Sequence, residues 1–251
     1  PRYRARGRMF RPMMLVRILE PIAGRPVVRI RLRPTRNFGA EAVCGRAGSH
    51  HIVFPVNELE YRVTTDASLS AMADQGPIVV DRPMTFVLGP NQTIEETPSV
   101  LAHSLLLETS SYWQDWVRTL AIPFDWQEEV IRAAITLKLC TFEDTGAVLA
   151  ALTTSIPEGP GSGRNWDYRY CWLRDSYFVI QALNRLGATR TMEAYLHFID
   201  HIVAGSAVHE LQPVYSLTGS PDMAERTLAS PAGYRGMGPV RVGNQAALQT
   251  Q

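Results

Sequence analysis

The chain contains little cysteine and no long hydrophobic run. Its three cysteines, Cys44, Cys140 and Cys171, are odd in number and widely spaced, so they form neither a disulfide framework nor a metal-binding pattern. No run of about 18 apolar residues occurs, which predicts no transmembrane helix. Residues 1–4 lack an initiator methionine and the apolar stretch of a signal peptide. These absences favour an interior piece of a longer cytoplasmic protein with no membrane partner.

What the chain does contain is an ordinary globular composition with an uneven charge. Of its 251 residues, 45% are hydrophobic and 20% are charged, which suits one large domain or two ordinary ones. Residues 1–36 carry eleven arginines and one acid, Glu20, although the net charge of the whole chain is only +1. The arginines alternate with other residues, which is typical of the solvent face of a β-strand. We therefore predict no nucleic-acid partner. The less favoured alternative, an arginine-rich nucleic-acid binder, would show steep salt-dependent retention on DNA.

The first hundred residues have the pattern of short β-strands. Apolar or alternating runs are punctuated by Pro, Gly, Asn and Asp, as in an antiparallel sandwich. A polar break between Pro90 and Pro98 ends this pattern, so we predict a β-sandwich domain over residues 1–98 that lacks its own start. The expected strands are Met14–Ile18, Val27–Leu32, His51–Phe54, Tyr61–Thr64, Ile78–Val80 and Met84–Leu88.

From residue 99 the apolar spacing becomes helical. We predict a linker helix within residues 99–124, with its aromatic residues at helical spacing between Thr109 and Leu120. Asp125 followed by Glu128 predicts a capping box for the next helix, with Trp126 on the apolar face of that helix. The remaining expected helices are 170–186 and 189–205, followed by a long loop over 206–245. This alternation of helices and long loops fits an α/α toroid, and it fits a plain helical bundle equally well.

The densest chemistry lies in residues 164–175. This segment holds four aromatic residues and five charged residues of both signs. Flat apolar rings beside planar hydrogen-bonding groups suit a sugar, which stacks its C–H face on a ring and offers hydroxyls at its edge. The alternative interpretation is structural, because Trp and Tyr are often half-buried and neighbouring Arg and Asp are often ordinary surface ion pairs.

Four ordered segments resemble glycoside hydrolase family 15, the glucoamylase and bacterial trehalase-like family. They are Thr153–Glu158, Arg164–Ser176, Leu211–Tyr215 with Gly219–Ser220, and Gly233–Asn244. The resemblance is strong over residues 110–251 and weak before them. It implies a β-sandwich followed by an (α/α)6 toroid, of which residues 125–251 form an incomplete first part. Because about two helical pairs cannot close a toroid, we expect some of their apolar surface to stay exposed.

The resemblance also implies which residues hold the sugar. The positions of Arg174 and Asp175 bind the glucose at the subsite of cleavage, and the aromatic residues of the segment lie in or near the same pocket. The residues Arg235 and Arg241 could in addition hold an anion, because some bacterial trehalases of the family depend on phosphate. We expect no cofactor. The residues expected to bind substrate are Trp166, Asp167, Tyr168, Tyr170, Trp172, Arg174, Asp175, Tyr234, Arg235, Arg241 and Asn244.

Inverting hydrolysis of an α-glucoside needs two carboxyl groups, one to protonate the leaving oxygen and one to activate water. The carboxylates near the signatures are Glu158, Asp167, Asp175 and Glu210. Asp175 lies beside Arg174, whose charge favours a carboxylate that accepts hydroxyls over one that donates a proton. In the family the general acid belongs to a later Trp-Glu segment and the general base to a segment later still. Neither segment occurs in residues 1–251, so no catalytic residue is assigned here.

Two other patterns receive ordinary interpretations. The pair His197 and His201 has helical spacing, but no third metal ligand is evident nearby, so we predict no metal site. Cys171 has no histidine placed beside it by the sequence and is predicted to be buried packing. The substrate is then a small-molecule or oligosaccharide α-glucoside, either trehalose or α-linked gluco-oligosaccharides. The alternative function is a non-catalytic carbohydrate-binding or regulatory fragment.

The purified 251-residue chain is predicted to hydrolyse no glucoside, because it carries residues that hold the sugar without the catalytic pair. The measurement is glucose release from trehalose and from maltose. Measurable turnover of either sugar by this chain would contradict the prediction.

Overall fold

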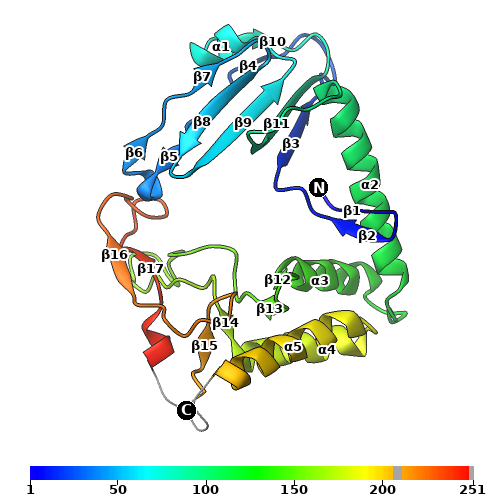
Figure 1. The fold of residues 1–251 in the computed structure, drawn as a ribbon, viewed down its shortest axis with the longest axis vertical. Coiled ribbons are helices and arrows are strands. Elements are labelled where there is room, and N and C mark those ends of the chain that lie inside the picture. Colours follow the sequence, from blue (N-terminus) through cyan, green and yellow to red (C-terminus); the bar gives the residue numbers. More distant parts are fainter. Residues whose placement is uncertain (206–210, 249–251) are drawn as a thin grey trace. The chain divides into compact units, whose positions relative to one another are not determined.

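The computed structural model describes residues 1–205 and 211–248. The chain divides into two compact units, Pro1–Asp115 and Trp116–Gln251, and each unit is described by itself. The first is rich in β-strands and the second contains most of the helices (Figure 1). The expectation of a β-rich first region followed by helices is therefore confirmed. No helix among the described residues is long and apolar enough to cross a bilayer.

The first unit is organised around a five-stranded antiparallel sheet (Figure 1). Its strands run side by side in the order β3, β11, β9, β8, β7. Their bounds are Leu15–Leu19 (β3), Met84–Pro90 (β11), Leu59–Thr65 (β9), His51–Val56 (β8) and Arg46–Ala47 (β7). The same unit contains three two-stranded pairs: Tyr3–Ala5 (β1) with Arg8–Phe10 (β2), Val27–Val28 (β4) with Ile78–Val79 (β10), and Thr35–Arg36 (β5) with Glu41–Ala42 (β6).

The core of this unit follows from the alternation of side chains along the strands. Ile52, Phe54 and Val63 are buried and pack together with Met72 of the short helix α1 (Leu69–Ala73) and with Met84. A 3-10 turn, η1 (Asn37–Gly39), joins β5 to β6.

The arginine-rich segments of this unit differ from the prediction in detail. The expected strand Val27–Leu32 is a strand only at Val27–Val28. The alternation of side chains continues beyond the strand, since Ile30 and Leu32 pack on the core while Arg29, Arg31 and Arg33 beside them are exposed. The earlier arginines form a hairpin, β1–β2, because Arg6 and Gly7 have positive φ and turn the chain.

The long helix α2 spans Pro98–Arg118 and carries the aromatic residues Tyr112, Trp113 and Trp116. Proline suits the first turn of a helix, where its missing N–H would have no intrahelical partner. One face of α2 receives the N-terminal chain: the Arg2 amide donates to Thr109 Oγ1 at 3.1 Å. The Arg2 guanidinium lies 5.0 Å from the Tyr112 ring centroid. Cation–π contacts of this kind explain why this aromatic stretch of α2 is partly covered.

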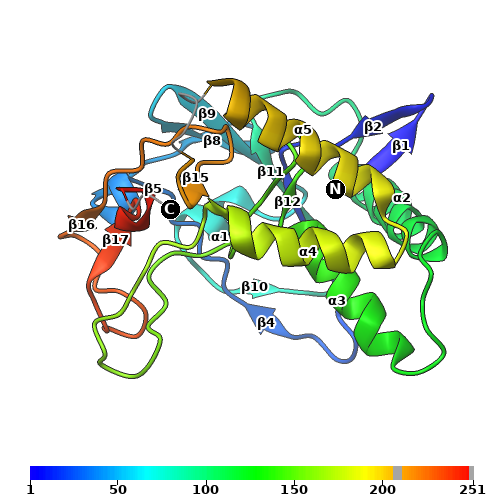
Figure 2. The same ribbon diagram turned by 90° about the horizontal axis from the view of Figure 1, so that it is seen from below.

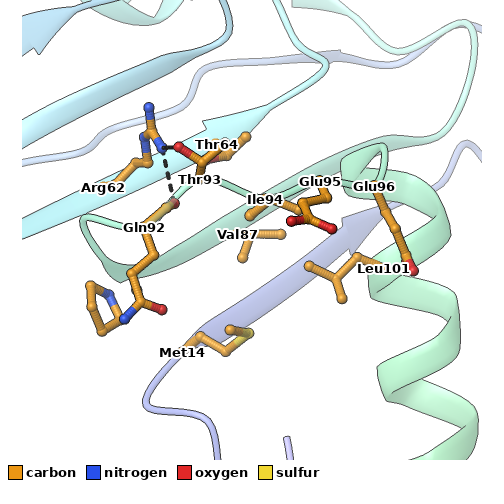
Figure 3. Close-up of a pocket in the computed structure, with 12 residues that line it drawn as sticks. Met14, Arg62, Thr64, Val87, Gln92, Thr93, Ile94, Glu95, Glu96 and Leu101 are labelled. Carbon is orange, nitrogen blue, oxygen red and sulfur yellow. Dashed lines mark hydrogen bonds between the residues drawn. The ribbon is translucent and has the colours of Figure 1, made fainter.

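Arg62 of β9 fixes the chain between the sheet and α2. Its Nη1 donates to the Gln92 carbonyl at 2.9 Å and approaches Thr93 Oγ1 at 3.4 Å (Figure 3). Beside this tether lies a hollow of about 300 Å³ with Met14, Val87 and Leu101 among its apolar lining and Glu95 and Glu96 among its polar lining (Figure 3). The tether thus holds the entry to α2 against the sheet.

The second unit contains three helices, α3 (Gln127–Leu139), α4 (Leu173–Arg185) and α5 (Thr189–Gly205). Helix α4 lies between the other two (Figure 2). The segments outside these helices form three short antiparallel strand pairs: Thr141–Phe142 (β12) with Ala147–Val148 (β13), Cys171–Trp172 (β14) with Val214–Tyr215 (β15), and Arg226–Leu228 (β16) with Val240–Val242 (β17). A 3-10 helix, η2 (Gln245–Leu248), follows β17.

Large apolar side chains pack where these helices meet. Leu183 of α4 is fully buried with Leu120 and Ala134, and Phe198 and Ile202 of α5 pack around Cys171. Other large apolar side chains of α4 and α5 are exposed: Tyr177, Phe178, Leu196 and Val203.

Two expectations at the start of α3 are wrong. The capping box does not form, because the N-cap residue is Trp126, whose side chain makes no capping hydrogen bond. Trp126 adopts a left-handed conformation and is 75% exposed, so it lies outside the apolar face of the helix. Helix α4 likewise begins at Leu173 and not at Tyr170, because Cys171 and Trp172 pair with β15.

The Gly146→Ala substitution is expected to destabilise the second unit by at least about 2 kcal/mol. Gly146 has a φ of +88°, and a Cβ there would overlap the Ala194 backbone of α5. The matched control is Gly159→Ala, where a Cβ meets nothing within 4 Å. Urea unfolding of the two variants measures the difference, and equal midpoints would contradict the prediction.

Candidate functional site

The signature segment forms one arm of an irregular hairpin in the second unit. Residues 150–158 run antiparallel to residues 164–170, with backbone hydrogen bonds from Ala151 to Tyr168 (2.9 Å), from Ser155 to Trp166 (2.9 Å) and from Glu158 to Arg164 (3.1 Å). Gly159–Gly163 closes the tip. Since side chains alternate along extended backbone, neighbouring residues of the signature point to opposite sides.

Asp167 lies on the buried side of this arm. It is 1% exposed and its carboxylate receives four hydrogen bonds. Arg169 provides three of them, from its amide (3.2 Å), its Nε (2.8 Å) and its Nη2 (2.7 Å). The Gly243 amide provides the fourth at 3.2 Å. Hydrogen bonding to Asp167 raises the pKa of Arg169, so the guanidinium stays charged.

Two asparagines attach the signature to residues 237–244. Asn165 is fully buried, and its Nδ2 donates to the carbonyls of Met237 (2.8 Å) and Pro239 (3.0 Å). Asn244 is also buried and donates to the Asp167 carbonyl at 3.1 Å. Gly243 reaches Asp167 in a left-handed conformation, φ +87°, where a Cβ would overlap the Ala224 backbone. The buried side of the signature is therefore fixed by protein groups.

Trp166, which lies between Asn165 and Asp167 in the sequence, is half-buried. The Arg241 guanidinium lies 5.0 Å from the Trp166 ring centroid and pairs with Glu225 at 2.8 Å. The backbone of Arg241 is held as well, because its amide donates to Ser155 Oγ at 2.7 Å and its carbonyl accepts from Thr154 Oγ1 at 2.7 Å. Arg241 thus stacks on the signature and is neutralised by an acid of its own unit.

Tyr168 and Trp172 form an aromatic pair with ring centroids 5.7 Å apart. The Tyr168 hydroxyl donates to Glu158 Oε1 at 3.1 Å, and Arg164 pairs with the other oxygen of Glu158 at 2.7 Å. Burial raises the pKa of Tyr168, and the hydrogen bond to Glu158 raises it further. The phenol therefore keeps its proton and can donate throughout the neutral range.

Tyr170 packs with Trp172 against buried Val214 and Met223. Burial raises the pKa of Tyr170, and the negative charge of Asp167 raises it further. The two aromatic residues thus form the junction between the signature and β15, with both side chains partly accessible.

The signature ends in the first turn of α4. The Leu173 amide donates to the Pro213 carbonyl at 3.1 Å, and Cys171 Sγ lies 3.2 Å from Ser176 Oγ. Burial raises the pKa of the Cys171 thiol, which fits the predicted packing role. Arg174 and Asp175 lie 3.2 Å apart, with side chains 74% and 52% exposed. Their polar groups are accessible to a ligand.

Tyr234 and Arg235 occupy an exposed turn, with the Arg235 guanidinium 5.3 Å from the Tyr234 ring centroid. Within residues 1–205 and 211–248, no hydrogen bond or ring contact joins Tyr234 or Arg235 to residues 164–175; the signature reaches this turn only through Asn165, which donates to the Met237 carbonyl. Glu210 lies outside the described residues. His197 and His201 are exposed on α5, and the described part of the chain contains no group of three metal-ligating side chains.

Three partners in this site were missed by the sequence analysis. Arg169 had a signal, because it follows Asp167 at the spacing that places both on one side of extended backbone. Glu225 and Ser155 had none, since they meet Arg241 only in the folded chain, from 16 and 86 residues away in the sequence.

The Glu225→Ala substitution is expected to destabilise the protein by about 1–3 kcal/mol, because it leaves the half-buried Arg241 charge without its acid. The Trp166 emission should shift as the guanidinium leaves the indole. Urea unfolding and tryptophan fluorescence measure both effects. Glu193→Ala, an exposed position on α5, is the control, and an equal midpoint for the two variants would contradict the prediction.

Comparison with known proteins places this geometry in a family. Residues 126–251 match the sequence model described as glycosyl hydrolases family 15. A trehalase of Thermoplasma acidophilum is 32% identical over 241 residues, which cover 94% of this chain and 41% of that protein. A trehalase of Mycolicibacterium smegmatis is 39% identical over 163 residues, 64% of this chain and 24% of that protein.

Trehalase 1 of Sulfolobus acidocaldarius is 37% identical over 144 residues, covering 57% of this chain and 25% of that protein. No solved structure shows significant similarity to the chain. The chain spans less than half the length of each of these three relatives. The family match covers the hairpin, α4 and residues 237–244, where the site residues lie. On this evidence the chain belongs to glycoside hydrolase family 15.

Proposed function

We propose that the protein containing this chain hydrolyses an α-glucosidic bond, with trehalose as the substrate, by an inverting mechanism. The observation that carries the proposal is the exposed Arg174–Asp175 pair, which follows the aromatic residues of the signature at the start of α4. The similar proteins named trehalase support trehalose over longer α-glucosides.

In this proposal the sugar lies against the aromatic surface and reaches the charged pair with its hydroxyls. The tilted rings of Tyr168 and Trp172 offer apolar area to the C–H face of a glucose ring. Arg174 donates to hydroxyl oxygens and Asp175 accepts from hydroxyl protons. Asp175 lies in the first turn of α4, where the helix dipole stabilises its negative charge. Trp166, Tyr170, Tyr234 and Arg235 complete the proposed walls.

The carboxylates of the hairpin and of the first turn of α4 are paired with arginines. Glu158, Asp167 and Asp175 each accept a hydrogen bond from an arginine side chain. In each of these pairs the carboxylate oxygens act as hydrogen-bond acceptors. We therefore assign the general acid and the general base of the inverting reaction to residues beyond those of this chain, and these 251 residues to substrate binding.

The fold belongs to the same proposal. We assign residues 1–98 to a β-sandwich, residues 99–124 to a linker helix and residues 125–251 to the first part of an (α/α)6 toroid. In that arrangement, further helices of the toroid would cover exposed apolar residues of α4 and α5 such as Phe178 and Leu196.

The test is glucose release by the intact protein from trehalose and, separately, from maltose. Proton NMR at early times should show equal amounts of α- and β-glucose from trehalose, because inversion converts one of its two α-linked sugars. The Arg174→Lys substitution should lower kcat/KM about 10- to 100-fold, because lysine cannot reproduce the planar fork of donors.

The matched control is Arg185→Lys, an exposed arginine in the last turn of the same helix. Retention of the α-configuration in both products would contradict inversion. Sugar binding without turnover by the intact protein would contradict hydrolysis and favour a non-catalytic carbohydrate-binding function.

A further inference from the structure

We infer that Asp167 is a positioning residue. Together with Arg169 and residues 243–244, it fixes the signature so that the rings of Trp166 and Tyr168 are presented to the sugar. The inference rests on the proposed function, which makes those rings part of the sugar site. It differs from the expectation that Asp167 itself binds the sugar.

The first argument is that Asp167 has no capacity left for a ligand. A carboxylate offers about four lone-pair sites. The Asp167 carboxylate receives four donors, three from Arg169 and one from Gly243, and its side chain is 0% exposed. A sugar hydroxyl would have to displace a charge-assisted hydrogen bond to reach it, and such bonds are about twice as strong as neutral ones.

The second argument is that each of these bonds fixes a different degree of freedom. Arg169 binds the carboxylate in two parallel bonds, at 2.8 and 2.7 Å, and therefore fixes the rotation of the Asp167 side chain. The Gly243 amide sets the distance between the signature and residues 237–244. Asn244 binds the Asp167 carbonyl and therefore fixes the peptide plane that leads to Tyr168.

The third argument is the alternation of side chains along the arm. Asn165 and Asp167 are buried on the side that faces residues 237–244, and both are tied there. Trp166 and Tyr168, the intervening residues, are only half-buried. Because each ring is joined through the backbone to an anchored residue beside it, the anchors set the direction in which the rings leave the chain.

The experiment uses the intact protein with the Asp167→Asn substitution. The asparagine side chain keeps the shape of the carboxylate, but its NH2 group faces the N–H donors that now bind Asp167. The substitution also removes the negative charge that pairs with Arg169. Hydrogen exchange should accelerate about tenfold or more over residues 164–170 and 240–244, with exchange in the middle of α4 unchanged. With trehalose, kcat/KM should fall about 10²-fold well below the melting temperature, since a small displacement of binding groups costs this much.

The control is Asp200→Asn, an exposed acid on α5 that should change neither measurement. If Asp167→Asn fails to fold, Asn244→Ala removes a single tie, and it should accelerate exchange at residues 167–170 and lower kcat/KM in the same direction. Unchanged exchange in a folded variant would overturn the inference. Accelerated exchange with kcat/KM equal to the control would also overturn it, because the anchor would then be structural only.

The two proposals fail differently. If the unsubstituted protein does not hydrolyse trehalose or maltose, the proposed function fails. In that case a calorimetric titration with trehalose tests the positioning role: Asp167→Asn should weaken binding about tenfold or more relative to Asp200→Asn. Equal affinities of these two variants would overturn the inference, as would the absence of trehalose binding by the unsubstituted protein.

Discussion

The buried carboxylate of Asp167 is the constraint on which the site depends. An ionised group removed from water is tolerated only when its charge is compensated and its lone pairs are occupied. Here the compensation comes from Arg169 two residues away, and the remaining bond comes from Gly243, 76 residues away. One compensated charge therefore joins a local motif to a distant segment. The left-handed backbone at Gly243, the buried Asn244 and the stacked Arg241 follow from the need to bring that segment close.

The residues singled out by their chemistry divide by burial. Asp167, Asn244 and the anchored Arg241 face protein partners, whereas Arg174 and Asp175 face outward from the first turn of α4. The aromatic residues lie between these two groups. A segment rich in aromatic and charged residues thus has two roles: one set of its side chains holds the backbone in place, and the other remains available to a ligand.

Much of this could be predicted from local pattern. The helix α5 and most of α4 follow from apolar spacing, and the strands β3, β8, β9 and β11 follow from alternation. The signature was recognisable because its composition suits neither a loop nor a core. The start of α4 was less predictable, because Cys171 and Trp172 form β14 by pairing with a strand more than forty residues away in the sequence. Contacts such as Glu225 with Arg241 carry no sequence signal, because nothing in the sequence marks Glu225 as the partner of Arg241. The exposed Trp126 shows that hydrophobicity alone does not decide burial at a helix terminus.

The hairpin tip at Gly159–Gly163 has a consequence for how such a site can diverge. Both arms are tied below the tip, by the bonds at Ser155 and Glu158 on one side and by Asn165 and Asp167 on the other. Lengthening a tip whose ends are already held costs little, about 0.6 kcal/mol for each doubling of the loop. Insertions here would therefore change the surface at the tip of the hairpin without breaking the hydrogen bonds of Asn165 and Asp167. The hairpin separates the part of the sequence that evolution can lengthen freely from the part that it must keep in register.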